Sequence, residues 1–233
     1  GLYMGAPFYA EYAKRYDQPD AFADIVNQFL IVARHTYDPT TGLYRHAFDD
    51  SRMMPWADSI TGQSPHAWGR AMGWFSMAIV DVLDFIPADQ PGRDELIKIL
   101  RGMVDTLITI QDPQTGGWYQ VPDRSGDPGN YVETSCTAMF AYSIFKAVRL
   151  GYLGESYLTA AERAYNGLID NFVTVDDKGL VTLTRTCGVA GLGGDPYRDG
   201  SYEYYIGEEI RDNDPKGVGP FILASLEYEM LLK

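Results

Sequence analysis

The sequence predicts an all-α protein of the α/α barrel or toroid class, built as an open arc. Three observations lead to this prediction: two kinds of helix alternate along the chain, a turn motif recurs at long spacing, and about seven helices are predicted in total. Helices that are apolar nearly all round are expected to be enclosed, whereas helices with one charged face are expected to lie outside them. We therefore expect an inner and an outer ring of helices within a single domain spanning residues 1–233.

The individual elements are predicted from the spacing of apolar residues and from Pro and Gly at element ends. The helices, in chain order, are Pro7–Tyr16, Ala21–Thr36, His66–Phe85, Arg93–Ile110, Val132–Leu150, Ser156–Phe172 and Val218–Leu232. Short extended segments are predicted at Leu43–Phe48, Trp118–Val121 and Leu180–Thr186. The interval Gly188–Pro215 is rich in Gly, Tyr and Asp and is predicted to be a long loop.

The two kinds of helix are assigned to the two rings. The inner ring takes the first helix and three segments that are apolar nearly all round, Trp74–Ile86, Cys136–Val148 and Phe221–Leu232. The remaining, amphipathic helices form the outer ring. Cys136 is expected to be a small core residue. Four inner and three outer helices are too few to close a ring, so we expect apolar edges that favour self-association.

A repeated turn motif connects each outer helix to the inner helix that follows it. The sequence DPTTGLY at Asp38–Tyr44 recurs as DPQTGGW at Asp112–Trp118, with a weaker copy, DDKGL, at Asp176–Leu180. Long repeats with one helical hairpin per unit are typical of arrays of αα units. All copies precede inner helices and therefore lie at one end of the array, where we expect a ligand to bind.

The composition argues against several classes of function. With 32 acidic and 19 basic residues the net charge is −13, which repels phosphate backbones, so no nucleic-acid partner is expected. No apolar run reaches the ~20 residues of a membrane span, and no membrane partner is expected. Cys136 and Cys187 do not form a disulfide framework, and the three His lack metal-ligand spacing, so neither a metal nor a cofactor is expected. This acidic chain fits a cytoplasmic location or a periplasmic one.

One stretch, Leu43–Phe75, concentrates His, Trp, Arg and acidic residues and is predicted to form one wall of a sugar-binding site. A single Trp is usually a core residue, but Trp56, Trp68 and Trp74 occur close together near one helix start. Flat rings of this kind stack on the apolar faces of sugars. Gly69 and Gly73 are one helical turn apart and allow a close approach by another backbone or by a ligand.

Arg70 enters an apolar inner helix, where an arginine is costly to bury unless a negative group meets it. One interpretation is a structural ion pair with Asp58 or another loop acid. The other is a clamp for a substrate carboxylate, assisted by the amide groups at the helix N-terminus. Both interpretations are open from the sequence alone.

His46 follows the first repeat motif, and by itself it would be read as a surface histidine. The corresponding positions in the other copies hold Gln120 and either Thr182 or Thr184, so a ring of inward-facing polar side chains is expected. The loop acids Asp49, Asp50 and Asp58 are candidates for paired acid–base catalysis, although loop acids are usually only solvated. Glu133 is expected to be an N-terminal helix cap.

Four segments together resemble a known family: GLYMGAPFYAEYA, YRHAFDDS, WGRAMGW and CGVAGLGGDPYRDGSYEYYI with NDPKGVGPF behind it. They resemble the unsaturated rhamnogalacturonyl hydrolases of glycoside hydrolase family 105, which are related to the unsaturated glucuronyl hydrolases of family 88. The resemblance implies an (α/α)6 barrel, of which this chain is the C-terminal part. It implies substrate-binding roles for Met4, His46, Trp68, Arg70 and Trp74.

The implied substrate is a disaccharide released by a pectin or rhamnogalacturonan lyase, with a 4,5-unsaturated uronic acid at its non-reducing end. An aspartic acid protonates C4 of the enol ether and then assists water to attack C5. In the family this Asp directly precedes the GLYM motif, so it is expected immediately before Gly1 and the chain as given is expected to be inactive. Two alternatives stay open: a non-catalytic carbohydrate-binding remnant, and an inverting glycosidase that uses Asp49 or Asp58.

Overall fold

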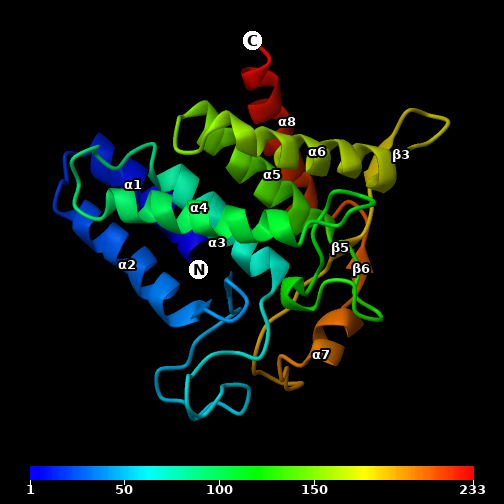
Figure 1. The fold of residues 1–233 in the computed structure, drawn as a ribbon, viewed down its shortest axis with the longest axis horizontal. Helices are drawn as coiled ribbons and strands as arrows, with labels where there is room; N and C mark the ends of the chain where they lie inside the picture. The colour runs from blue at the N-terminus through cyan, green and yellow to red at the C-terminus, as the bar shows by residue number, and fades with distance from the viewer.

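The computed structural model describes residues 1–233 as two concentric, open layers of helices (Figure 1). The inner layer runs α1–α3–α5–α8, each helix packing against the next, and the outer helices α2, α4 and α6 pack against α1, α3 and α5 respectively. The inner helices are α1 (Leu2–Arg15), α3 (Gly69–Val82), α5 (Thr134–Arg149) and α8 (Pro215–Leu231). The outer helices are α2 (Ala21–Thr36), α4 (Arg93–Thr109) and α6 (Leu158–Phe172). The predicted all-α, incomplete α/α toroid is therefore confirmed.

Burial separates the two layers as the sequence pattern predicts. Every residue of α5 from Thr134 to Ala147 is buried, including Cys136, because the helix is enclosed by α3, α6 and α8. By contrast, the outer helix α4 buries one stripe, Leu96, Leu100, Met103, Val104 and Leu107, and leaves its charged face in water.

Gly69 and Gly73 allow α3 and α5 to approach closely, as predicted. A Cβ atom on Gly69 would lie 2.8 Å from Sγ of Cys136, and one on Gly73 would lie 2.6 Å from Sδ of Met139. Both distances are too short for a real Cβ, so larger residues would push the two inner helices apart.

The repeated turns adopt one conformation. Asp38 accepts hydrogen bonds from the backbone N–H of Thr40 and the hydroxyl of Thr41, and Asp112 accepts both from Thr115. Each turn ends on a Gly with positive φ, Gly42 at 72° and Gly116 at 71°. The first turn joins β1 (Tyr37–Asp38) to β2 (Leu43–Tyr44), and the weaker copy joins β3 (Val173–Val175) to β4 (Val181–Leu183). Near the second copy, the predicted extended segment Trp118–Val121 forms only an isolated bridge between Tyr119 and Val132.

Most predicted helix ends lie within three residues of the observed ones, and the largest differences are at the first helix and in the long loop. The first helix begins at Leu2 instead of Pro7, because a Pro in the second turn of a helix removes only one backbone hydrogen bond, here the one to Tyr3. The predicted loop Gly188–Pro215 contains α7 (Tyr202–Gly207), capped by Ser201, and β6 (Ile210–Arg211), which pairs with β5 (Thr186–Cys187) just before the loop. The chain therefore has eight α-helices where about seven were predicted.

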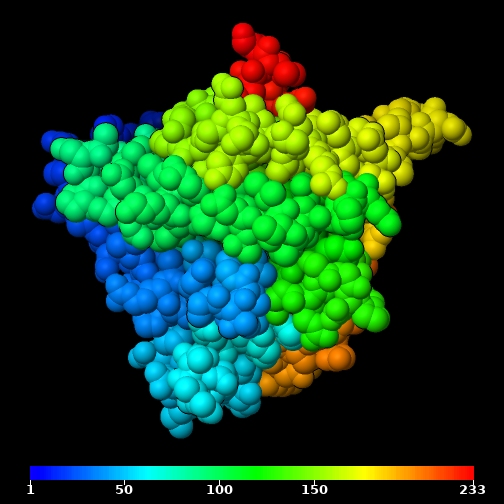
Figure 2. Space-filling view, in the orientation of Figure 1, coloured from blue at the N-terminus to red at the C-terminus, as the bar shows by residue number.

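The two ends of the arc are apolar and uncovered, as expected. On α1 the exposed stripe is Met4, Phe8 and Tyr12, continued by the C-cap residue Tyr16, and on α8 it is Ile222, Leu226 and Met230. Both stripes repeat every four residues, so each occupies one helix face. In Figure 2 the C-terminal turns of α8 project beyond the rest of the surface. None of the helices combines the length and the apolar character needed to cross a membrane.

Candidate active site

A cavity of about 680 Å³ opens between the N-termini of α1 and α3, the C-terminal half of α2 and the segment that follows β2. Ten of its fifteen lining residues are hydrophobic, so a few polar groups stand against apolar walls, as is usual in small-molecule sites. Gly1 is one of the lining residues. The cavity lies at the end of the arc that carries the first repeat turn, where a ligand was expected.

Trp68 and Trp74 both line this cavity, but in different ways. Trp74 is partly exposed and stacks on Tyr3 with the ring centroids 4.5 Å apart, so α1 and α3 jointly present an aromatic surface. Trp68 is 6% exposed, and its Nε1–H donates a hydrogen bond to Oε1 of Gln120, 3.1 Å away. Trp56 lies outside this cavity and lines a separate surface pocket of about 580 Å³ beside Asp58. The predicted wall therefore contains two of the three tryptophans.

His46 lines the cavity with its ring packed on Trp68. Burial, followed by the positive charge of Arg198 and by the N-terminal amine, lowers the pKa of His46 to about 4. The imidazole is therefore neutral at neutral pH. Its Nδ1 lies 2.6 Å from the hydroxyl of Tyr205, which belongs to α7.

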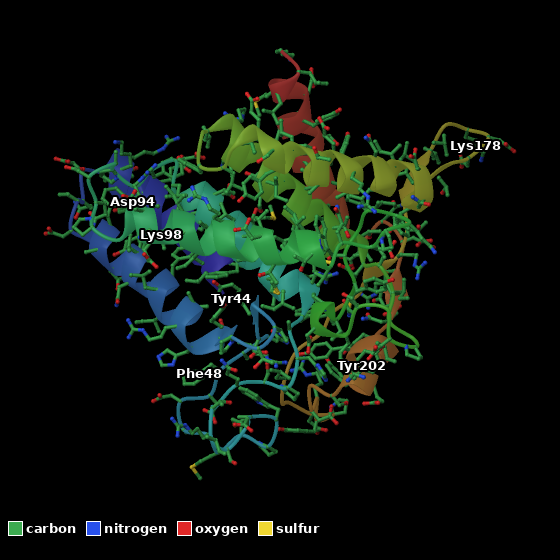
Figure 3. All side chains as sticks on the ribbon, in the orientation of Figure 1. Tyr44, Phe48, Asp94, Lys98, Lys178 and Tyr202 are labelled. Atoms are coloured by element: carbon green, nitrogen blue, oxygen red, sulfur yellow. The ribbon has the colours of Figure 1, made fainter.

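The predicted polar ring is confirmed for His46 and Gln120 but not for the third copy. Nε2 of Gln120 donates to Sγ of Cys187 at 3.0 Å and to the carbonyl of Tyr205 at 3.3 Å, so both repeat-related side chains converge on Tyr205. In the third copy Thr184 donates to the carbonyl of Phe172 and Thr182 accepts from Nδ2 of Asn213, so neither joins this group. Figure 3 shows the two regions that meet here, with Phe48 on the loop after β2 and Tyr202 on α7.

Arg70 forms a structural ion pair, and its partner is Glu133 instead of Asp58. The two side chains are 3.2 Å apart and essentially unexposed. Arg70 also donates from Nε to the hydroxyl of Ser135, from Nη1 to the carbonyl of Gly188 and from Nη2 to that of Cys187. Every guanidinium nitrogen is used, and the side chain does not line the cavity. Contact between Arg70 and a substrate stays a prediction.

Glu133 has the predicted capping role as well as the ion pair. Its carboxylate accepts the backbone N–H of Cys136 at 2.7 Å, which caps α5, and that of Cys187 at 2.9 Å, which fixes β5. Together Arg70 and Glu133 tie α3, α5 and the segment that leads to α7 into one unit. This unit lies behind Trp68, whose ring centroid is 5.5 Å from the Arg70 guanidinium carbon.

Met4 does not line the cavity. Its side chain is 67% exposed on the open face of α1, because the neighbouring Tyr3 occupies the face that turns toward α3 and Trp74. Successive residues of a helix point about 100° apart, and here Leu2 and Tyr3 turn toward the cavity while Met4 turns away from it. In this chain Tyr3 lines the cavity and Met4 does not, and contact between Met4 and a substrate stays a prediction.

The acids Asp49 and Asp58 stabilise their own loop. Asp49 accepts backbone N–H groups from Met54, Met53 and Ser51, and Asp58 accepts those of Thr61 and Ile60. These hydrogen bonds lower the pKa of both carboxyls. The largest contribution comes from the N–H of Met54 for Asp49 and from the N–H of Thr61 for Asp58. A lowered pKa is the wrong direction for a general acid, and neither residue lines the cavity.

Asp50 is the acidic residue among those that line the cavity, and it is exposed. Asp50 was one of the predicted candidates, whereas Tyr205, which has no exposed surface, was not predicted from the sequence. The run Ser201–Tyr205 carries a weak signal for it, since a Ser followed by a polar and aromatic run is typical of a capped helix start.

Comparisons with known proteins agree with the geometry. The model of Glycosyl Hydrolase Family 88 matches residues 1–232. Protein Atu3128 of Agrobacterium fabrum is 40% identical over 236 residues, which cover 99% of this chain and 100% of that relative. Unsaturated rhamnogalacturonyl hydrolase YesR of Bacillus subtilis is 26% identical over 181 residues, which cover 78% of this chain and 47% of the relative.

A solved structure of a family 105 glycoside hydrolase from C. acetobutylicum superposes with a TM-score of 0.96 at 50% sequence identity. The match covers 99% of this chain and 64% of that one, so the present chain spans less than two thirds of that neighbour. Since the family match extends over all residues but the last and the fold agrees throughout, the chain belongs to Glycosyl Hydrolase Family 88.

Proposed function

We propose that this chain forms the substrate-binding wall of a hydrolase that acts on disaccharides ending in a 4,5-unsaturated uronic acid. The observation that carries the proposal is the cavity, in which the Trp74–Tyr3 stack and the neutral ring of His46 face the same space as Gly1. The unsaturated rhamnogalacturonyl hydrolase YesR, to which the chain is similar, supports the class of sugar.

Each part of the wall suits a different part of such a sugar. The aromatic surface of Trp74 and Tyr3 suits the apolar face of a flattened, unsaturated ring. His46 offers a hydrogen bond to a hydroxyl or carboxylate oxygen without adding charge. The N-termini of α1 and α3 line the cavity, and the positive ends of these helix dipoles favour the uronate carboxylate there.

The proposed chemistry is hydration of the double bond. The carboxylic acid expected before Gly1 gives its proton to C4, and the resulting cation at C5 takes up water, whose proton returns to the carboxylate. The hemiketal then opens and releases the neighbouring sugar. Gly1 lines the cavity, which supports a place beside it for the proposed acid. Apolar walls around that position raise the pKa of an acid there, in opposition to the positive end of the α1 dipole, which lowers it.

The Asp that the resemblance implies is not among residues 1–233, so the 233-residue chain alone is proposed to bind but not to turn over. Two chains are compared on a lyase-generated unsaturated disaccharide: this chain, and one extended at its N-terminus to include the Asp. Loss of the ultraviolet absorbance of the double bond is expected only with the extended chain. Equal rates for the two chains would refute the proposed role of that Asp.

Asp58→Asn, made in the extended chain, separates this function from an inverting glycosidase that uses Asp49 or Asp58. The proposal expects most of the activity to remain, because Asp58 holds a loop outside the cavity. Abolished activity with an intact fold would favour the inverting glycosidase. If the extended chain binds sugar but is inactive, the non-catalytic carbohydrate-binding remnant is the better account.

A further inference from the structure

Tyr205 and His46 form a short, buried contact whose direction can be worked out from the structure. The Tyr205 hydroxyl lies 2.6 Å from Nδ1 of His46, and either atom could be the donor when geometry alone is considered. Distances this short are typical of an O–H donor, because N–H donors usually lie 2.9–3.0 Å from their acceptors.

The burial of Tyr205 decides the direction. Its side chain has no exposed surface, and its hydroxyl has no other partner within the protein. If Nδ1 of His46 carried the hydrogen, the phenolic O–H would be a buried donor without an acceptor, which is costly. If Tyr205 donates, Nδ1 accepts and the hydrogen of the neutral ring must be on Nε2.

Nε2 of His46 is the atom that this arrangement leaves open. It has no hydrogen-bond partner within the chain and it is not fully buried. The ring to which it belongs lines the cavity. A hydrogen on Nε2 is therefore accessible from the cavity and able to meet an acceptor there.

Tyr205 is held firmly enough to impose this geometry. Its carbonyl accepts Nε2 of Gln120, its N–H donates to the carbonyl of Ser201 at 3.2 Å, and its ring lies 6.4 Å from that of Trp68 in a stacked orientation. Gln120 is in turn fixed by Trp68 and Cys187. Contacts from Gln120 and Trp68, which belong to other segments of the chain, thus fix the backbone and the ring of Tyr205.

We propose that Tyr205 is a positioning residue for substrate binding: its hydroxyl holds His46 in the Nε2–H form and aims that hydrogen at an acceptor oxygen of the ligand. The identity of the ligand as an unsaturated uronide rests on the proposed function. The tautomer of the His46 ring does not depend on the proposed function, and it is tested without any sugar.

The first experiment is nitrogen-15 NMR of the histidine rings of the 233-residue chain at neutral pH. Only three histidines are present, and a His46→Gln variant assigns the signal. Wild type is expected to show a protonated Nε2 and an unprotonated Nδ1 in a single form. Tyr205→Phe, which removes only the hydroxyl, is expected to show a mixture of both forms.

The matched control is Tyr202→Phe, on the same short helix. Its hydroxyl donates to the carbonyl of Pro128 and does not reach His46, so the His46 signals should stay as in wild type. A protonated Nδ1 in wild type, or unchanged His46 signals in Tyr205→Phe, would overturn the proposal.

The second experiment measures the affinity of the same three proteins for an unsaturated uronyl disaccharide by calorimetry. Tyr205→Phe should bind about fivefold more weakly, the usual effect of one net hydrogen bond, and Tyr202→Phe should bind as wild type does. Wild-type affinity in Tyr205→Phe would count against positioning. Failure of the wild-type chain to bind would count against the proposed function alone, because the ring spectra decide the form of His46 separately.

Discussion

Arg70 and His46 both lie against the ring of Trp68, and their hydrogen bonds are arranged in contrasting ways. Arg70 uses every nitrogen on partners within the protein and has 1% of its surface exposed. His46 uses one nitrogen on Tyr205 and leaves the other open to the cavity. The charged Arg70 therefore stabilises the fold, whereas the neutral His46 keeps one nitrogen free to bind a ligand.

The largest expected effect is a loss of stability when the buried Arg70 is replaced. Arg70→Ala leaves Glu133 as a buried, unpaired carboxylate and should lower the free energy of unfolding by about 3–5 kcal/mol. Urea unfolding of the full chain measures the change.

Arg15→Ala is the control for this substitution, because both side chains of the Arg15–Glu11 ion pair are exposed. It should lower the free energy of unfolding by less than about 1 kcal/mol. Equal losses in the two variants would mean that burial does not distinguish the two ion pairs.

The next largest effect is a loss of stability at acidic pH. The pKa of His46 is lowered to about 4 in the folded chain, from about 6.5 in the unfolded one, so the unfolded state binds more protons between these values. Stability that is fully present above pH ~6.5 should fall as the pH drops toward ~4, by at most about 3 kcal/mol from this group.

His46→Gln should lose this part of the pH dependence. Unfolding free energies measured at neutral pH and near pH 4 test it, since the difference should be smaller in the variant than in wild type. An equal pH dependence in both proteins would show that His46 is not the group responsible.

A smaller effect is expected at the open wall of the cavity. Trp74→Ala removes half of the stack with Tyr3 and should weaken binding of an unsaturated uronide about tenfold, which corresponds to about 1.4 kcal/mol. Trp56→Ala, made outside the cavity, should leave the affinity near that of wild type. Calorimetric titration of both variants checks the difference, and a larger loss in Trp56→Ala would move the binding site to the other pocket.

The smallest effect on stability is expected at the ends of the arc. Phe8→Ser on α1 should change the free energy of unfolding by no more than about 0.5 kcal/mol, since Phe8 is 72% exposed. It should nevertheless reduce self-association through the apolar edges, seen as a lower average mass in light scattering. An unchanged mass distribution at high concentration would show that α1 takes no part in self-association.

Local and periodic features were predictable from the sequence, because they depend on residues close together in the chain. The inner and outer layers, the Asp–Gly turns, the close approach at Gly69 and Gly73 and the cap at Glu133 all follow from spacing and residue type. The family resemblance rested in the same way on continuous motifs.

The remainder depends on contacts between distant segments. The pairing of Arg70 with Glu133 could not be read from spacing, since any loop acid would have satisfied the same requirement. The orientation of Met4 depends on which face of α1 meets α3. Tyr205 sits in a six-residue helix within a Gly-rich interval, too short for an apolar period to show.

The most direct test of the central claim, that the cavity beside His46 binds the sugar, is a titration followed by NMR. An unsaturated uronyl disaccharide is added to the 233-residue chain while the ring signals of His46 and the indole signals of the four tryptophans are recorded. The signals of His46 and Trp74 are expected to shift together and saturate at one concentration, with those of Trp56 unchanged. Saturating shifts at Trp56 with His46 and Trp74 unaffected would contradict the account.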